Sequence, residues 1–140
     1  LERRGMNFNS MWVRNRTTKT NGVSYILQRG GAAVFTPEGQ KQIKENIAVY
    51  KNNAKVIMKA LQNCGIRYCG GKNAPYVWMK CPGGDDSWAL FDKLLNEAQI
   101  VGTPGAGFGV YGEGYFRLSS FGNPDDTAEA AKRIEKMFSK

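Results

Sequence analysis

Histidine is absent from the 140 residues of the sequence. Its absence excludes the Ser-His-Asp and Cys-His arrangements of nucleophilic catalysis, and most zinc sites, from this stretch of chain. Cysteine is scarce, and Cys64, Cys69 and Cys81 form no C-x-x-C pair. An odd number of cysteines without a secretory signal is typical of reduced thiols in a cytoplasmic protein. We therefore expect the three cysteines to serve packing, and we expect no metal site.

Long apolar runs and blocks of one charge are missing as well. No apolar stretch approaches the length that a membrane span needs. The net charge is +8, but the 20 Lys and Arg residues are scattered, with no run of five like charges. We therefore expect no membrane partner and no nucleic acid partner, because neither an apolar span nor a clustered basic patch is present. A general preference for anionic small molecules fits the charge as well.

The segment between Thr36 and Gly65 has the strongest helical pattern. Thr36 is a candidate N-cap, Pro37 suits the first helical position, and Gly65 is a good stop. The helix would have about 28 residues and a length of about 42 Å, which exceeds the width of a small domain. A helix of this length often connects two bodies, and we expect its second half to pack on the domain that follows. Its apolar residues form one stripe: Ile43, Ile47, Tyr50, Ala54, Ile57 and Leu61.

The chain before this helix has a weaker pattern. Residues 1–19 are polar and basic with a few large apolar residues, and we interpret them as a loose entry segment with at most one short helical turn. A helical pattern then runs from Asn21 to about Phe35, weakened by the Gly30-Gly31 pair. On local grounds Asn21 is interpreted as the cap of this helix.

After Gly65 the pattern changes to short alternating elements. Strands are predicted in "IRYCGG", "APYVWMKCP" and "QIVG" and around Arg117, and helices after Asp85-Asp86 and after Asn123-Pro124. The order β-β-α-β-β-α predicts an α/β chain whose last part is a small α+β sandwich, with helices on one face of a sheet. Tyr76, in the second strand, is interpreted as a core aromatic.

A glycine-rich loop, "GTPGAGFGVYGEG", precedes the strand around Arg117. It contains the pattern G-x-G-x-x-G at Gly107, Gly109 and Gly112, which in a dinucleotide site stands between a strand and a helix. Here a strand follows, so the pattern does not predict a nucleotide. Six glycines between positions 102 and 114 instead predict a loop that passes close to another backbone or to a ligand.

Arg117 stands in the middle of the stretch "GEGYFRLSS". Strand alternation places Phe116 and Leu118 on one face and Arg117 on the other. Two interpretations stay open at this point. In the first, Arg117 is a charged residue on a half-exposed strand surface. In the second, its planar guanidinium is a fork that binds a carboxylate or a phosphate with two parallel hydrogen bonds.

Four segments taken together are similar to a known family. They are "TTKTNGVSYILQRGGAAVFTPEGQKQI", "GGKNAPYVWMKCP", "EAQIVGTPGAGFGVYGEGYFRLSSFG" and the closing helix. In this order they resemble the LL-diaminopimelate aminotransferases, which are fold-type-I enzymes dependent on pyridoxal 5'-phosphate. The resemblance covers nearly all of residues 10–140. It implies three parts: the tail end of the large cofactor-binding domain (1–35), the long connecting helix (36–65) and the C-terminal small domain (66–140).

The resemblance also assigns site residues. Arg117 matches the arginine that grips the substrate α-carboxylate. Asn21 matches an asparagine that reaches the substrate and the cofactor across the interface of a homodimer. The implied reaction is amino transfer between LL-diaminopimelate and 2-oxoglutarate in lysine biosynthesis, so that an amino acid and a 2-oxo acid are the small-molecule partners. Two alternatives stay open: an aminotransferase of the aromatic or alanine type, and a non-catalytic binding or oligomerisation module.

One departure from the family is large. The sequence has no S-F-S-K-type segment with the lysine that forms the Schiff base with the cofactor, and it lacks the aspartate that pairs with the pyridine nitrogen. The resemblance places both upstream of Leu1. We therefore expect no catalytic residue in this sequence, and no transaminase activity from these 140 residues alone.

Overall fold

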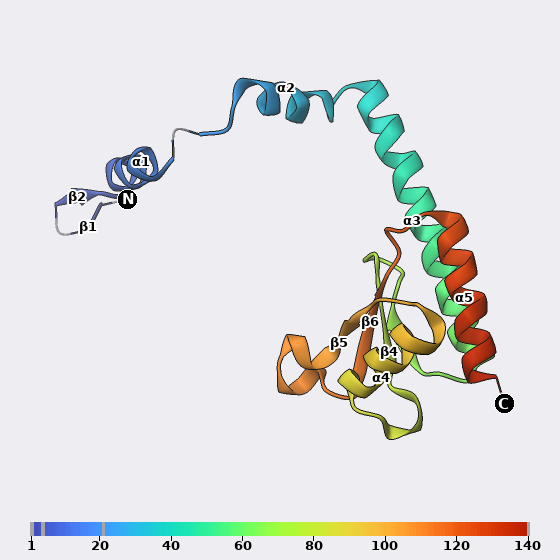
Figure 1. The fold of residues 1–140 in the computed structure, drawn as a ribbon. Coiled ribbons are helices and arrows are strands. Elements are labelled where there is room, and N and C mark those ends of the chain that lie inside the picture. Colours follow the sequence, from blue (N-terminus) through green and yellow to red (C-terminus); the bar gives the residue numbers. More distant parts are fainter. Residues whose placement is uncertain (1, 4, 21, 140) are drawn as a thin grey trace. The chain divides into compact units, whose positions relative to one another are not determined.

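The computed structural model describes residues 2–3, 5–20 and 22–139, and Figure 1 shows their elements. The chain divides into two compact units, Leu1–Ile43 and Lys44–Lys140. The long helix α3 (Pro37–Asn63) starts in the first unit and continues into the second. The division into residues 1–35, 36–65 and 66–140 stays a prediction about the domains of the whole protein.

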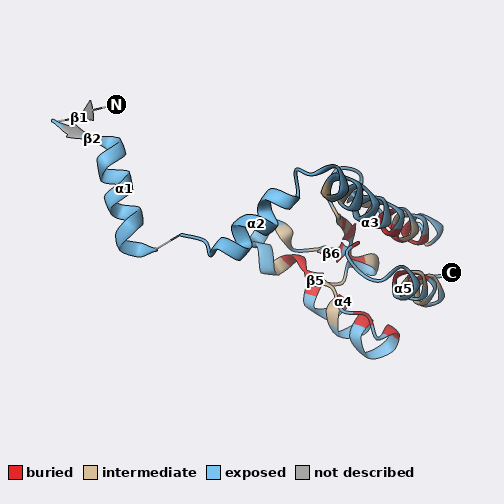
Figure 2. Ribbon diagram, turned by 90° about the horizontal axis from the view of Figure 1, so that it is seen from above, coloured by how far each residue is buried: buried red, intermediate tan, exposed pale blue. Residues whose placement is uncertain are grey.

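The first unit contains a helix that the sequence pattern missed. Its first elements are β1 (Glu2–Arg3), the antiparallel partner β2 (Met6–Asn7) and α1 (Phe8–Lys19). The expected loose segment is therefore wrong. The Asn7 side chain accepts hydrogen bonds from the backbone N–H groups of Asn9 (2.9 Å) and Ser10 (3.3 Å), which caps α1. Hydrophobic periodicity missed this helix because none of its residues is buried and no apolar stripe faces a core (Figure 2).

The next helix, α2 (Tyr25–Ala33), is shorter than predicted. Its N-cap position is Ser24 and residues 22–24 are not helical, so the expected start is too early. Asn21 lies outside the described residues, and its predicted role stays a prediction. Among the helices that the structure describes, none is both long and apolar enough to cross a membrane.

Both predicted ends of α3 are confirmed. At its start, the Thr36 hydroxyl accepts a hydrogen bond from the N–H of Gly39 at 3.1 Å. Past its end, the N–H of Ile66 donates to the carbonyl oxygen of Leu61 at 2.9 Å. This bond belongs to a Schellman motif, which needs the left-handed backbone that Gly65 adopts with a φ of 67°.

The second unit is built on a four-stranded antiparallel sheet with the order β3-β4-β6-β5. Its elements are β3 (Tyr68–Gly70), β4 (Tyr76–Lys80), α4 (Ser87–Lys93), β5 (Thr103–Pro104), β6 (Tyr115–Ser119) and α5 (Pro124–Phe138). A π-helical turn (Leu94–Ala98) extends α4. The predicted order β-β-α-β-β-α after Gly65 is confirmed.

The predicted strand in "QIVG" is wrong, because these residues close the preceding helical turn. Gln99 adopts a left-handed φ of 55°, which an extended strand does not allow. The N–H of Ile100 donates back to the carbonyl oxygen of Leu94 at 3.0 Å. Strand β5 therefore begins only at Thr103.

The sheet has one face that packs against helices. The cross-strand pairs Val77–Leu118 and Met79–Phe116 place their side chains on this face. They form one buried core with residues from α3, α4 with its π-helical turn, and α5: Ile57, Leu61, Leu90, Leu94 and Ile134. Helices α3 and α5 lie side by side in both ribbon views (Figures 1 and 2). Arg117 alternates with Phe116 and Leu118 along β6, so it lies on the opposite face.

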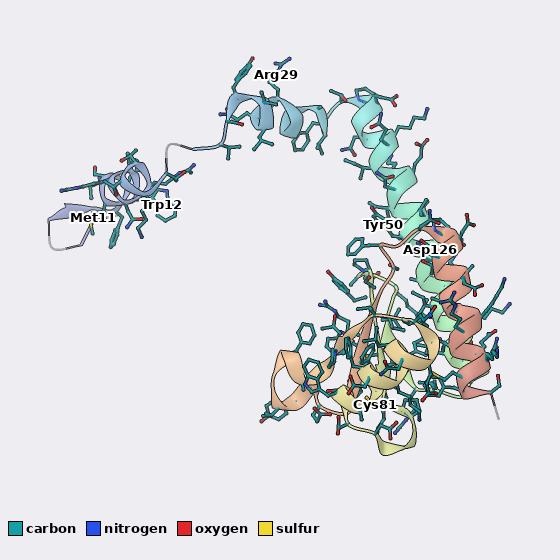
Figure 3. All side chains as sticks on the ribbon, viewed as in Figure 1. Met11, Trp12, Arg29, Tyr50, Cys81 and Asp126 are labelled. Carbon is teal, nitrogen blue, oxygen red and sulfur yellow. The ribbon has the colours of Figure 1, made fainter. Side chains whose placement is uncertain are left out.

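The second half of α3 packs on this unit as predicted. Ala54, Ile57 and Leu61 are buried. Tyr50, labelled in Figure 3, makes an edge-on contact with Phe121, and their ring centroids are 5.0 Å apart. Asn53, which periodicity did not single out, is also buried. Its amide donates to the carbonyl oxygens of residues 120 (3.1 Å) and 122 (2.8 Å), so it holds the segment between β6 and α5.

The three cysteines differ in burial and should differ in reactivity. Burial, together with the nearby Glu113, Asp85 and Asp86, raises the pKa of the Cys81 thiol to about 11. A protonated thiol is a poor nucleophile, and Cys69 is exposed while Cys81 is buried. Brief alkylation with iodoacetamide at pH 8 should therefore label Cys69 and spare Cys81 in the folded chain. Mass spectrometry of the peptides checks this, with the urea-unfolded chain as control. Equal labelling of both cysteines in the folded chain would contradict this packing.

Candidate functional site

Arg117 lies at the centre of β6, paired on both sides. Its cross-strand partners are Trp78 in β4 and Thr103 in β5. One guanidinium nitrogen, Nη2, donates to the Thr103 hydroxyl at 3.4 Å, which is a long hydrogen bond. The helices fill the other face of the sheet, so the guanidinium points away from the core and is half-buried.

Aromatic rings flank the guanidinium of Arg117. Its central carbon lies 4.4 Å from the ring centroid of Tyr76 and 4.6 Å from that of Phe108. Phe108 in turn meets Trp78 edge-on, with centroids 5.0 Å apart. Both distances from the guanidinium are within the range of a cation–π interaction. The interpretation of Tyr76 as a core aromatic is therefore wrong: it stands on the Arg117 face and is half-buried.

The guanidinium of Arg117 keeps most of its hydrogen-bonding capacity. An arginine has five N–H donors in a planar fork, and here one of them makes one long bond. Among the described residues, the ion pairs are Lys93–Asp85 (3.8 Å) and Arg133–Glu129 (3.0 Å), so no carboxylate of this part of the chain neutralises Arg117. A charged fork held between rings, without an internal anion, is suited to bind the carboxylate of a ligand.

The glycine-rich loop passes close to its own backbone, as predicted. It forms two short 3-10 turns, Gly105–Phe108 and Val110–Gly112. A Cβ atom placed on Gly105 would lie 1.8 Å from the carbonyl oxygen of Gly112, and one on Gly112 would lie 2.1 Å from that of Gly105. Only glycine allows this approach, which brings Phe108 back over the sheet to Arg117.

Ser87 bonds both ends of this loop, at one end through the carboxylate of Glu113. Glu113 accepts hydrogen bonds from the backbone N–H of Ser87 (2.7 Å) and from its hydroxyl (3.1 Å). The Ser87 hydroxyl also accepts a bond from the N–H of Ala106 at 3.2 Å. Ser87 is the first residue of α4, where N–H groups without a partner inside the helix favour an anion. Sequence analysis missed this link, because its residues are 26 positions apart.

Glu113 should make the stability of the chain depend on pH. The N–H groups of Ser87 and Gly114 hold the pKa of its carboxyl below the usual value. A group whose pKa is lower in the folded chain stabilises the fold above its ordinary pKa, and this contribution is lost as the pH falls through the lowered value. Thermal unfolding should therefore show that Glu113→Gln is less stable than wild type at pH 7. The difference should shrink as the pH falls below the ordinary pKa of a glutamate, about 4.3, and through the lowered pKa of Glu113. Glu45→Gln, at an exposed position of α3, is the control. A difference that stays constant with pH would contradict the role of this carboxylate.

The other predicted features of the site fall outside this arrangement. Asn21 lies outside the described residues, so its predicted contacts with the substrate and the cofactor stay a prediction. Within residues 2–3, 5–20 and 22–139, no group of three or more His, Cys, Asp or Glu side chains could hold a metal ion.

Comparisons with known proteins find one family that matches this chain. Residues 11–134 match the family described as aminotransferase class I and II. An LL-diaminopimelate aminotransferase from Lawsonia intracellularis is 56% identical over 130 residues, which are 93% of this chain and 32% of that protein. The solved L,L-diaminopimelate aminotransferase from Chlamydomonas reinhardtii has a TM-score of 0.89 at 39% identity, over 94% of this chain and 32% of that one.

A second branch of aminotransferases is similar at a lower level. The solved aromatic aminotransferase from Pyrococcus horikoshii has a TM-score of 0.71 at 28% identity, over 76% of this chain and 29% of that one. The chain therefore spans about a third of the length of the relatives that it matches.

Proposed function

Because the chain belongs to the aminotransferase class I and II family, we propose that the whole protein is an LL-diaminopimelate aminotransferase that works with pyridoxal 5'-phosphate. The relatives with this name support the proposal, since they match 93% or more of the chain at identities well above that of the aromatic aminotransferase. Their names concern proteins about three times as long, so the activity is proposed for the whole protein.

The single observation that carries the amino-acid and 2-oxo-acid part of the proposal is the guanidinium of Arg117, which makes one long hydrogen bond and no ion pair within the described residues. An α-amino acid such as LL-diaminopimelate and a 2-oxo acid such as 2-oxoglutarate both have a carboxylate next to the reacting carbon. A planar fork receives such a carboxylate with two parallel hydrogen bonds. The fork fixes the orientation of the substrate as well as its position, which is what a reaction with one defined C–H bond needs.

The described residues fit the substrate carboxylate and do not form a site for the cofactor. The site consists of the guanidinium of Arg117 and three aromatic rings, those of Tyr76, Trp78 and Phe108. These residues do not form a set of hydrogen-bond donors arranged around a phosphate. When bound, the cofactor supplies an electron sink. The role of this part of the chain is to bind and orient the carboxylate and to keep water from one side of it with Phe108.

The remaining parts of the proposal concern the assembly. We infer a cytoplasmic homodimer in which Asn21 of one subunit reaches the active site of the other, as the resemblance implies. An amino acid and a 2-oxo acid are the partners, and lysine biosynthesis is the pathway. Cross-linking of the whole protein, or sedimentation, tests the dimer.

The substrate is tested directly with the whole protein. Purified with pyridoxal 5'-phosphate, it should transfer the amino group of LL-diaminopimelate to 2-oxoglutarate. Phenylalanine and alanine are the comparison substrates, because they represent the aromatic and alanine types. Turnover of these two with none of LL-diaminopimelate would overturn the assignment within the family.

A further inference from the structure

We propose that Phe108 is a positioning residue, which holds the guanidinium of Arg117 against Tyr76 in the orientation that receives the substrate carboxylate. This inference rests on the proposed function for its substrate and on the geometry of the site for its mechanism. Phe108 does not reach the core, since 50% of its surface is exposed. Its ring makes a T-shaped contact with Trp78, and the guanidinium of Arg117 lies over its face.

Little else holds the guanidinium in place. Its hydrogen bond within the described residues, to the Thr103 hydroxyl, is long at 3.4 Å. An arginine side chain has many rotamers, and an unrestrained guanidinium would sample several of them before each binding event. The two rings lie at 4.4 Å and 4.6 Å from its central carbon, at nearly equal distances. Apart from the bond to Thr103, the guanidinium N–H donors make no hydrogen bond within the described residues, so they can serve a ligand.

The loop that carries Phe108 is itself restrained. Ser87 binds it at both ends, through the N–H of Ala106 and through the carboxylate of Glu113. The close approach of Gly105 and Gly112 narrows the loop between these two points. A loop fixed at its ends presents Phe108 in one place, which is the condition for a ring to orient its neighbour.

Three substitutions distinguish the effect of the aromatic ring face of Phe108 from the effect of its side-chain volume. Phe108→Tyr keeps the ring face, Phe108→Leu keeps much of the volume without it, and Phe108→Ala removes both. In the whole protein, Phe108→Leu and Phe108→Ala should raise KM for the amino-acid substrate by about threefold to thirtyfold, and change kcat less. Phe108→Tyr should restore the wild-type KM. Val110→Ala, on the same loop and 84% exposed, is the matched control and should behave as wild type.

A double-mutant cycle tests whether Phe108 acts through Arg117. If it does, Phe108→Leu should change kcat/KM by less than about twofold once Arg117 is replaced by Lys, because the fork it orients is gone. Equal effects of Phe108→Leu with and without Arg117 would overturn the inference. A wild-type KM in Phe108→Leu would overturn it as well. The temperature of unfolding of each variant shows whether a loss of folding is the cause, and Phe108→Tyr and Phe108→Leu should both unfold near the wild-type temperature.

If the proposed substrate is wrong, the experiment gives a result that differs from a failure of the inference about Phe108. In that case the wild-type enzyme does not turn over LL-diaminopimelate, and the cycle is carried out with whichever amino acid it accepts. Every such substrate has the carboxylate on which the cycle depends, so the inference about Phe108 is confirmed or rejected either way.

Discussion

Replacing Arg117 by Lys in the whole protein should lower kcat/KM for the amino-acid substrate by about one to three powers of ten. Lysine keeps the charge and loses the fork. The change removes one of two parallel charge-assisted hydrogen bonds, each worth roughly 1.5–3 kcal/mol, at about 1.4 kcal/mol per tenfold in rate. It also lets the carboxylate rotate, so orientation suffers together with binding. Steady-state kinetics of the two proteins give the measurement.

Arg117→Ala should cost more than Arg117→Lys, because the bound carboxylate then lacks a counter-charge. The absorbance of the resting enzyme with its cofactor should change little in either variant, since Arg117 is proposed to face the substrate. Arg133→Lys is the control: Arg133 is half-buried and bonds Glu129 on α5, the carbonyl oxygen of Ala98 and the side chain of Gln99. Helix α5 packs on the face of the sheet opposite Arg117, so this replacement should leave the kinetics nearly unchanged. Near-wild-type kinetics for Arg117→Ala would contradict this role and favour the other interpretation, in which Arg117 is a charged residue on a half-exposed strand.

Gly105→Ala should destabilise the chain by roughly 1–3 kcal/mol and impair substrate binding as well. The new Cβ would meet the carbonyl oxygen of Gly112 at 1.8 Å, and backbone atoms on both sides of the loop would have to move. Movement of the loop displaces Phe108, which lies three residues further on beside Arg117. Denaturant unfolding measures the first effect, and KM for the amino-acid substrate measures the second.

Gly107→Ala is the matched control for stability. It makes the same change in the same 3-10 turn, but its Cβ would have no heavy atom within 4 Å. It should unfold within about 0.5 kcal/mol of wild type. Equal stability of the two variants would show that the close approach of Gly105 and Gly112 does not hold the loop.

Local chemistry made part of the fold predictable. The ends of α3 follow from Thr36, Pro37 and Gly65, whose backbone preferences act over a few residues. The two faces of β6 follow from simple alternation, which correctly placed Arg117 opposite the core. The six glycines before it correctly predicted a close approach of backbones.

Features without a local signal were missed. Helix α1 has a cap, Asn7, but no buried stripe, so periodicity gave no sign of it. The link between Ser87 and Glu113, and the rings of Tyr76 and Phe108 around Arg117, join residues that only the folded sheet and loop bring together. The segment "QIVG" has the composition of a strand and gave no indication that Gln99 adopts a left-handed backbone, which rules out a strand there. The position of Arg117 on the free face of β6 was therefore predictable, the residues that surround its side chain were not, and its role in a site stays a prediction.

A crystal structure of the whole protein with its cofactor and LL-diaminopimelate tests the central claim most directly. We predict that the carboxylate next to the reacting carbon accepts two parallel hydrogen bonds from the guanidinium of Arg117, at about 2.7–2.9 Å. The guanidinium should remain between Tyr76 and Phe108. A substrate carboxylate bound by other residues, with Arg117 turned toward solvent, would contradict the account.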